Sequence, residues 1–129
     1  MQVIAESHNI KLYAPDDAYL SYFNSPYIGH SSGYAIDVYP EHAEWKGPVV
    51  SPISGKIMRI KRMKMGRGKE FPTQEQDFAI GILPEDSESN IVRIMHASPS
   101  VKEGEFIECG DLIGKTIRSR YFNYWTGPH

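Results

Sequence analysis

The chain has 129 residues, a net charge of −2, 40% hydrophobic and 23% charged residues, which is the composition of one globular domain able to build its own core. A charge so close to neutral argues against a nucleic-acid partner for the chain as a whole, and no apolar run approaches the about 18 residues of a membrane span. The single cysteine, Cys109, excludes an internal disulfide. Eleven glycines and nine prolines indicate frequent turns and favour an all-β design.

The first 28 residues combine aromatic side chains with turn formers. Short strands are predicted at Val3-Ile4 and at Ile10–Tyr13, and Ala14–Asp17 has the residues of a turn. Asp16 or Asp17 is also a candidate cap for a short helix that would run to Tyr22. The N-terminal sequence MQVIAESHNI has no basic segment followed by an apolar run, so no secretory signal is expected.

The segment Gly29–Pro40, GHSSGYAIDVYP, places a histidine and an aspartate close together. Asp37 lies inside a mostly apolar, β-favouring run that predicts a largely buried strand. A buried carboxylate is costly unless it is paired or coordinated, and His30 is a natural partner for it in binding a divalent metal. The alternative is an exposed histidine and an aspartate satisfied by backbone amides.

The next segment predicts a strand at Val49-Val50, a tight turn over residues 51–55 and a second strand over Lys56–Arg62. Half of the fourteen Lys and Arg residues fall between Lys56 and Lys69, interleaved with apolar residues. The cluster indicates either a groove for an anionic polymer or a solvated strand face whose charges discourage edge pairing. We favour the solvated face, because no nucleic-acid-binding motif accompanies the cluster.

Two apolar runs, Gln76–Leu83 and Asn90–His96, predict a hairpin with the acidic loop Pro84–Ser89. His96 is expected to close the second strand, as a packed residue or a functional one. In the following VKEGEFIECGDLIGK, the glycines at 104, 110 and 114 predict turns with positive backbone angles. The whole pattern predicts one all-β domain over residues 1–129, an antiparallel sandwich or barrel.

Taken in order, these pieces resemble the lysostaphin-type zinc endopeptidases, a glycyl-glycine endopeptidase family that cuts peptidoglycan cross-bridges. The matching motifs are the His30…Asp37 strand, VVSPISGKI, Ile94-Met95-His96, VKEGEFIECGDLIGK and the terminal Thr126–His129. They cover residues 29–129 in the family's order. The resemblance implies a barrel-sandwich hybrid with a central groove and one Zn²⁺ at the floor of that groove.

By the same resemblance, His30 and Asp37 would be metal ligands, and His96 and His129 would be the two catalytic histidines. The expected activity is hydrolysis of a peptide bond in a peptide or peptidoglycan-like substrate. Three departures stand out. First, the third zinc ligand would lie two positions past His129, which makes a truncated domain the expectation. Second, the spacing from His30 to Asp37 is longer than is usual in the family. Third, the family works mostly outside the cell, whereas this sequence predicts a cytoplasmic protein by default.

Two other functions remain open. A non-catalytic module on the same scaffold would bind a peptide or glycan through aromatic side chains, namely Tyr27, Tyr34, Tyr124 and Trp125. A biotinyl or lipoyl carrier domain would use Lys64 of Met63-Lys64-Met65, but that lysine precedes the VKEG turn instead of following it. The carrier is therefore disfavoured.

Overall fold

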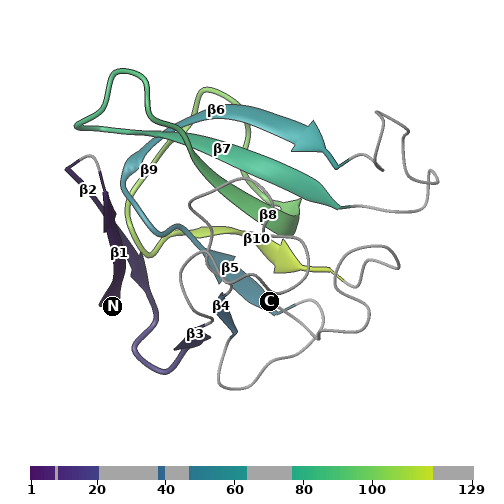
Figure 1. The fold of residues 1–129 in the computed structure, drawn as a ribbon. Helices are drawn as coiled ribbons and strands as arrows, with labels where there is room; N and C mark the ends of the chain where they lie inside the picture. The colour runs from purple at the N-terminus through teal and green to yellow at the C-terminus, as the bar shows by residue number, and fades with distance from the viewer. Residues whose placement is uncertain (8, 21–37, 40–46, 64–76, 118–129) are drawn as a thin grey trace.

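The computed structural model describes residues 1–7, 9–20, 38–39, 47–63 and 77–117, which form antiparallel strands without any helix among them (Figure 1). The all-β fold predicted from the sequence is therefore confirmed. The strands are β1 (Gln2–Ser7), β2 (Ile10–Ala14), β3 (Tyr19–Leu20), β4 (Val38–Tyr39), β5 (Pro48–Val50), β6 (Gly55–Arg62), β7 (Phe78–Pro84), β8 (Val92–Pro99), β9 (Phe106–Ile107) and β10 (Leu112–Thr116).

The N-terminal residues form the β1–β2 hairpin and the first strand of the small β3–β4 sheet. The turn predicted at Ala14–Asp17 is present, with the N–H of Ala18 donating to the carbonyl of Pro15 at 3.0 Å. The predicted helix start at Asp16 or Asp17 is wrong. Strand β3 follows the turn directly, and its cross-strand pairing with β4 competes successfully with the weak local helix signal.

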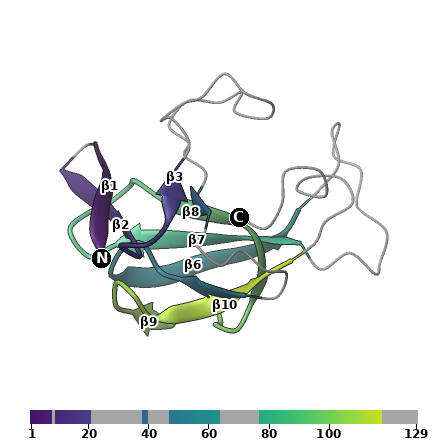
Figure 2. The ribbon, with the colours of Figure 1, turned by 90° about the horizontal axis from the view of Figure 1, so that it is seen from below.

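Strands β5 to β10 form one sheet in the order β5-β10-β8-β7-β6-β9. Strand β5 lies at one edge, yet the short turn after it leads into β6 near the other edge. That turn is tied to the β9–β10 turn, because the N–H of Ser51 donates to Asp111 and the N–H of Gly110 donates to Ser51, each at 2.8 Å. The sheet is therefore curled into a half-barrel, with β9 and β10 turning below β6, β7 and β8 (Figure 2).

Two of the three predicted turn glycines have the expected conformation. Gly104 and Gly110 both have φ of 92°, and each is the third residue of a turn closed by a backbone hydrogen bond, Lys102 to Glu105 and Glu108 to Asp111. Gly114 differs, since it lies within β10 and is required for another reason. A Cβ at Gly114 would collide with the backbone carbonyl of Ser98 on β8.

The core fills the concave side of the half-barrel with aliphatic side chains from β6, β7, β8, β9 and β10. Its fully or almost fully buried members are Ile57, Ile80, Ile82, Ala97, Ile107 and Ile113. Ile80 has no exposed surface and pairs in register with Ile60 and Ile94 on the neighbouring strands. Burial of each isoleucine side chain contributes about 2 kcal/mol, so the curl is stabilised mainly by these residues.

We expect Ile80→Ala to lower the free energy of unfolding by about 3 kcal/mol, because it leaves a cavity in a closely packed core. Ile91→Ala is the matched control, since Ile91 is 49% exposed, and its loss should cost less than about 1 kcal/mol. Urea denaturation followed by circular dichroism measures both. Equal losses in the two variants would contradict this description of the core.

Candidate functional site

Of the four site residues predicted from the sequence, only His96 lies within the described residues. His30, Asp37 and His129 lie outside them, so their convergence on one metal stays a prediction. His96 is on β8, and its surroundings can be built up from the strands around it.

His96 is paired with a buried carboxylate that faces it from the start of β7. Its Nδ1 lies 2.9 Å from Oδ2 of Asp77, and the two side chains are 14% and 0% exposed, respectively. An ionised carboxylate can only accept hydrogen bonds, so the proton of this bond belongs to Nδ1 of the imidazole. Removal of either partner would leave the other buried without its hydrogen bond, at a cost of about 1–3 kcal/mol or more.

A β-bulge in β8 turns His96 toward Asp77. Phe78 pairs with Ala97 and Ile80 pairs with Ile94, so Met95 and His96 together lie opposite the single residue Ala79. His96 is the bulged residue with left-handed backbone, at φ of 65°. Bulges of this kind redirect side chains and are frequent beside functional sites. The prediction that His96 closes its strand is wrong, because β8 continues through the bulge to Pro99.

The backbone around Asp77 holds the carboxylate in place. The carbonyl of Asp77 accepts a hydrogen bond from the N–H of Met63 at 2.8 Å, which extends the β6–β7 ladder by one step. Ile80 and Ile82 of β7 are fully buried in the core, so strand alternation places Asp77, Ala79 and Gly81 on the opposite face. The Asp77–His96 pair therefore belongs to the outer face of the sheet and not to its aliphatic core.

Sequence reasoning missed Asp77, although a signal was present. A carboxylate immediately before the apolar run FAIGIL raises the same question as Asp37 does within its own apolar run. What could not be read from the sequence is the partner, because the bulge decides which residue of β8 faces Asp77.

The pair has the arrangement of an acid–base group. With Nδ1 held by Asp77, proton transfer at this imidazole runs through Nε2. Oδ1 of Asp77 is buried and has no hydrogen-bond partner among the described residues. The described part of the chain contains no group of three or more His, Cys, Asp or Glu side chains placed to hold a metal. A zinc site therefore needs the predicted ligands outside that part.

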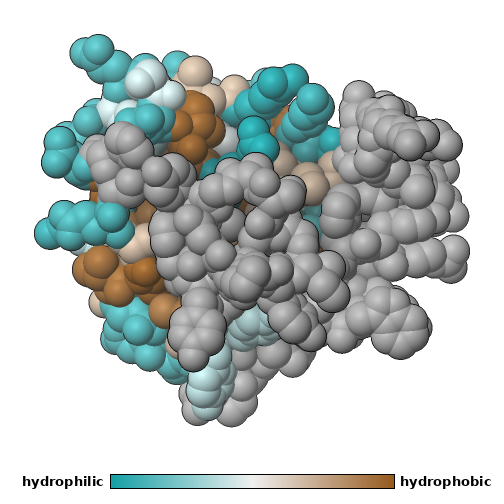
Figure 3. All heavy atoms as spheres, viewed as in Figure 1, coloured by the Kyte–Doolittle hydropathy of each residue, from teal (hydrophilic) through white to brown (hydrophobic). Residues whose placement is uncertain are grey.

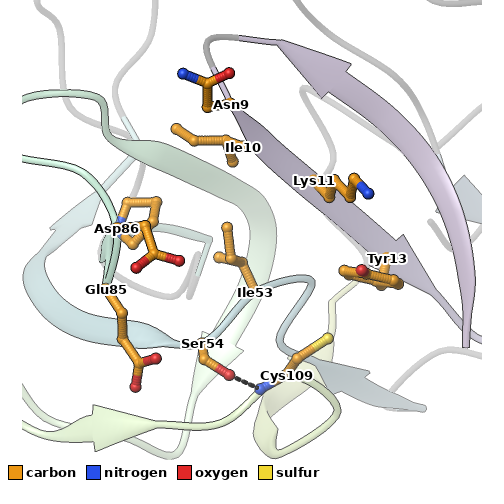
Figure 4. A pocket seen from close by; sticks show the side chains of 10 residues that line it. Asn9, Ile10, Lys11, Tyr13, Ile53, Ser54, Glu85, Asp86 and Cys109 are labelled. Carbon is orange, nitrogen blue, oxygen red and sulfur yellow. Dashed lines mark hydrogen bonds between the residues drawn. The ribbon is translucent and has the colours of Figure 1, made fainter.

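A hollow of about 330 Å³ lies where the β1–β2 hairpin meets the end of the curled sheet (Figure 4). Lys11 and Tyr13 line it from β2, Glu85 and Asp86 from the loop after β7, and Cys109 from the β9–β10 turn. The hairpin is tied here by the N–H of Tyr13, which donates to Pro52 at 2.9 Å. Ser54 Oγ accepts the N–H of Cys109 at 2.8 Å.

Cys109 has the properties of an unactivated thiol. Burial raises its pKa, the N-terminal ammonium lowers it to a smaller extent, and the Asp111 carboxylate raises it again. A nucleophilic cysteine needs the opposite, a lowered pKa and an adjacent base. We therefore interpret this hollow as a structural junction and place the candidate site at Asp77 and His96.

Residues 10–129 match the model of a protein family, a domain of unknown function (the DUF8155 N-terminal domain). The chain belongs to this family. No curated protein and no solved structure matches the DUF8155 domain described here. In the described part of the domain, no helix is long and apolar enough to cross a membrane.

The Asp77–His96 bond predicts one tautomer of the imidazole. In the neutral ring, the proton should reside on Nδ1, and two-dimensional long-range ¹⁵N–¹H NMR distinguishes this form from the Nε2–H tautomer. Asp77→Asn should shift the population toward the Nε2–H form, because an amide can also donate to Nδ1. Finding the Nε2–H tautomer in the unmodified protein would contradict the geometry.

The raised pKa of Cys109 predicts slow alkylation. A thiol with a raised pKa contains less thiolate at any pH below it, so the reaction with iodoacetamide should be slower than that of free cysteine at about pH 8. Its rate should also reach half-maximum at a higher pH than that of free cysteine. Mass spectrometry follows the modification, and a half-maximum at or below that of free cysteine would be inconsistent with a desolvated thiol.

Proposed function

We propose that this domain is a zinc-dependent hydrolase of peptide bonds, similar to the lysostaphin-type endopeptidases, in which His96 transfers the proton and Asp77 positions it. The observation that carries the proposal is the 2.9 Å bond between a fully buried carboxylate and the Nδ1 of a nearly buried imidazole. Geometry of this kind fixes the tautomer that a general acid–base needs.

The backbone at His96 supports a functional interpretation. A non-glycine residue at φ of 65° costs about 1–2 kcal/mol, which a glycine at the same place would avoid. The conformation places the imidazole against Asp77, so the strain is tied to the orientation of a titratable side chain.

The proposed metal ligands are His30 and Asp37, with His129 as the second acid–base residue. Bound zinc would activate a water molecule and polarise the scissile carbonyl. The role of His96 is to accept or return a proton through Nε2, and the role of Asp77 is to hold the ring proton of the neutral imidazole on Nδ1. The substrate class, a peptide with small residues at the scissile bond, rests on the resemblance alone.

The experiment uses the full chain with one equivalent of Zn²⁺ and a fluorogenic peptide that contains a glycyl-glycine bond. His96→Gln should lower kcat at least about 100-fold, because it removes the proton carrier. Asp77→Asn should lower kcat about 10–100-fold with little change in KM, because it disturbs the tautomer without removing the base. The activity of Asp77→Asn should also show an altered pH profile.

Lys115→Gln, an exposed substitution on β10, is the control for unspecific loss of activity. Isothermal titration calorimetry with Zn²⁺ should give stoichiometric binding to the unmodified protein and to His96→Gln, since His96 is not a proposed ligand. Failure to bind zinc would refute the hydrolase and favour a non-catalytic binding module. Hydrolysis that survives His96→Gln would refute the role of the pair.

A further inference from the structure

A cationic trough runs along the outer face of β6, β7 and β8, away from the core. Its volume is about 560 Å³, and the side chains that line it are basic, apolar or small. The lining consists of Met58, Arg59, Lys61, Arg62, Met63, Ala79, Gly81, Ile91, Arg93 and Met95.

The register of the sheet explains the shape of the cationic trough. Arg59, Gly81 and Arg93 lie side by side on the three strands, and Lys61 lies beside Ala79 in the next row. The small residues Ala79 and Gly81 of β7 therefore form the floor of the cationic trough, and long side chains from β6 and β8 form its two walls. With strands about 4.8 Å apart, the two arginine backbones stand about 10 Å from each other across Gly81.

The charge of the cationic trough contrasts with that of the whole chain. The chain has a net charge of −2, yet four cations and no acidic side chain occur among the described lining residues. Arg59, Lys61 and Arg93 make no salt bridge with another described residue. Glu103 contacts β6 at the strand edge, where its carboxylate accepts the N–H of Ile60 at 2.9 Å. This face therefore attracts anions.

Apolar side chains between the cations limit the kind of anion. Met58, Ile91 and Met95 are 45%, 49% and 42% exposed, and methionine adapts readily to the shape of apolar ligand groups. Figure 3 shows hydrophobic and hydrophilic residues interspersed in the upper part of this view, where β6 and β7 run in Figure 1. The described lining contains no aromatic side chain on which bases could stack, which disfavours single-stranded nucleic acid.

We propose that the cationic trough binds an extended acidic peptide whose carboxylates alternate with apolar side chains. Arg59 and Arg93 bind carboxylates on either side of Gly81, since guanidinium groups match carboxylate geometry, and the methionines cover the apolar residues between them. This binding does not depend on zinc or on hydrolysis.

The test measures fluorescence anisotropy of a labelled peptide of about eight residues, with Glu and Leu in alternation, titrated with the full chain without added metal. The neutral analogue with Gln in place of Glu should bind at least about fivefold more weakly. The double variant Arg59→Gln/Arg93→Gln should weaken binding of the acidic peptide by about fivefold or more, and its salt dependence should be shallower.

Two further variants keep the result interpretable. Lys102→Gln/Lys115→Gln removes the same charge from exposed positions outside the cationic trough and should leave binding unchanged. Gly81→Val leaves all charges in place but fills the floor, where a Cβ would already lie 3.3 Å from Ile91 Cγ2, and should weaken binding. Circular dichroism confirms that each variant is folded.

Equal affinity for the acidic and the neutral peptide would overturn the proposal. So would equal loss of binding in the two double variants, because the attraction would then be one of overall charge. Tighter binding of a single-stranded oligonucleotide than of the acidic peptide would assign the cationic trough to nucleic acid instead. Hydrolysis by the zinc-loaded protein is a separate measurement, so loss of peptide binding leaves the proposed hydrolase function to its own test.

Discussion

The hydrogen bond between Asp77 and His96 is the interaction on which the outer face of this domain depends. A carboxylate with no exposed surface is costly to bury, and the imidazole of His96 pairs with it at 2.9 Å. That contact in turn requires the bulge in β8, since a regular strand would not place two successive residues opposite Ala79. The candidate acid–base pair therefore depends directly on the register between β7 and β8.

The residues that stabilise the curled sheet and the candidate functional residues lie on opposite faces of it. Its concave side is filled with isoleucine from β6, β7, β9 and β10, and the paired turns at residues 51–54 and 108–111 hold the curl. The opposite side carries Asp77, His96 and the cationic trough, with Ala79 and Gly81 as its low floor. Because the two faces alternate along the same strands, a rigid core fixes the positions of the polar groups behind it.

The strands and turns of this domain were largely predictable, because they follow from local patterns. The apolar runs Gln76–Leu83 and Asn90–His96 and the glycines at 104 and 110 indicate their structures without reference to the rest of the chain. The contact between Asp77 and His96 was not predictable, since it depends on a register shift between strands. The need for glycine at position 114 was not predictable for the same reason. A Cβ there would collide with the backbone of β8, and no local sequence pattern reveals that neighbour.

The cationic trough along β6 was predictable only in part. Its charges and methionines are visible in the sequence, where they favour a solvated face. Only the register of the sheet shows that Arg59 and Arg93 lie on either side of a glycine. The predicted metal ligands His30 and Asp37 remain a hypothesis that rests on sequence resemblance. The family match over residues 10–129 is neutral on this point, because the DUF8155 domain has no assigned function.

The most direct test of the central claim is a crystal structure of the zinc-loaded protein with anomalous data collected at the zinc edge. We predict one anomalous peak, with His30 and Asp37 as the ligands of the metal, near a His96 whose Nδ1 is still bonded to Asp77. An anomalous peak remote from His96, no peak at saturating zinc, or an imidazole turned away from Asp77 would contradict the account.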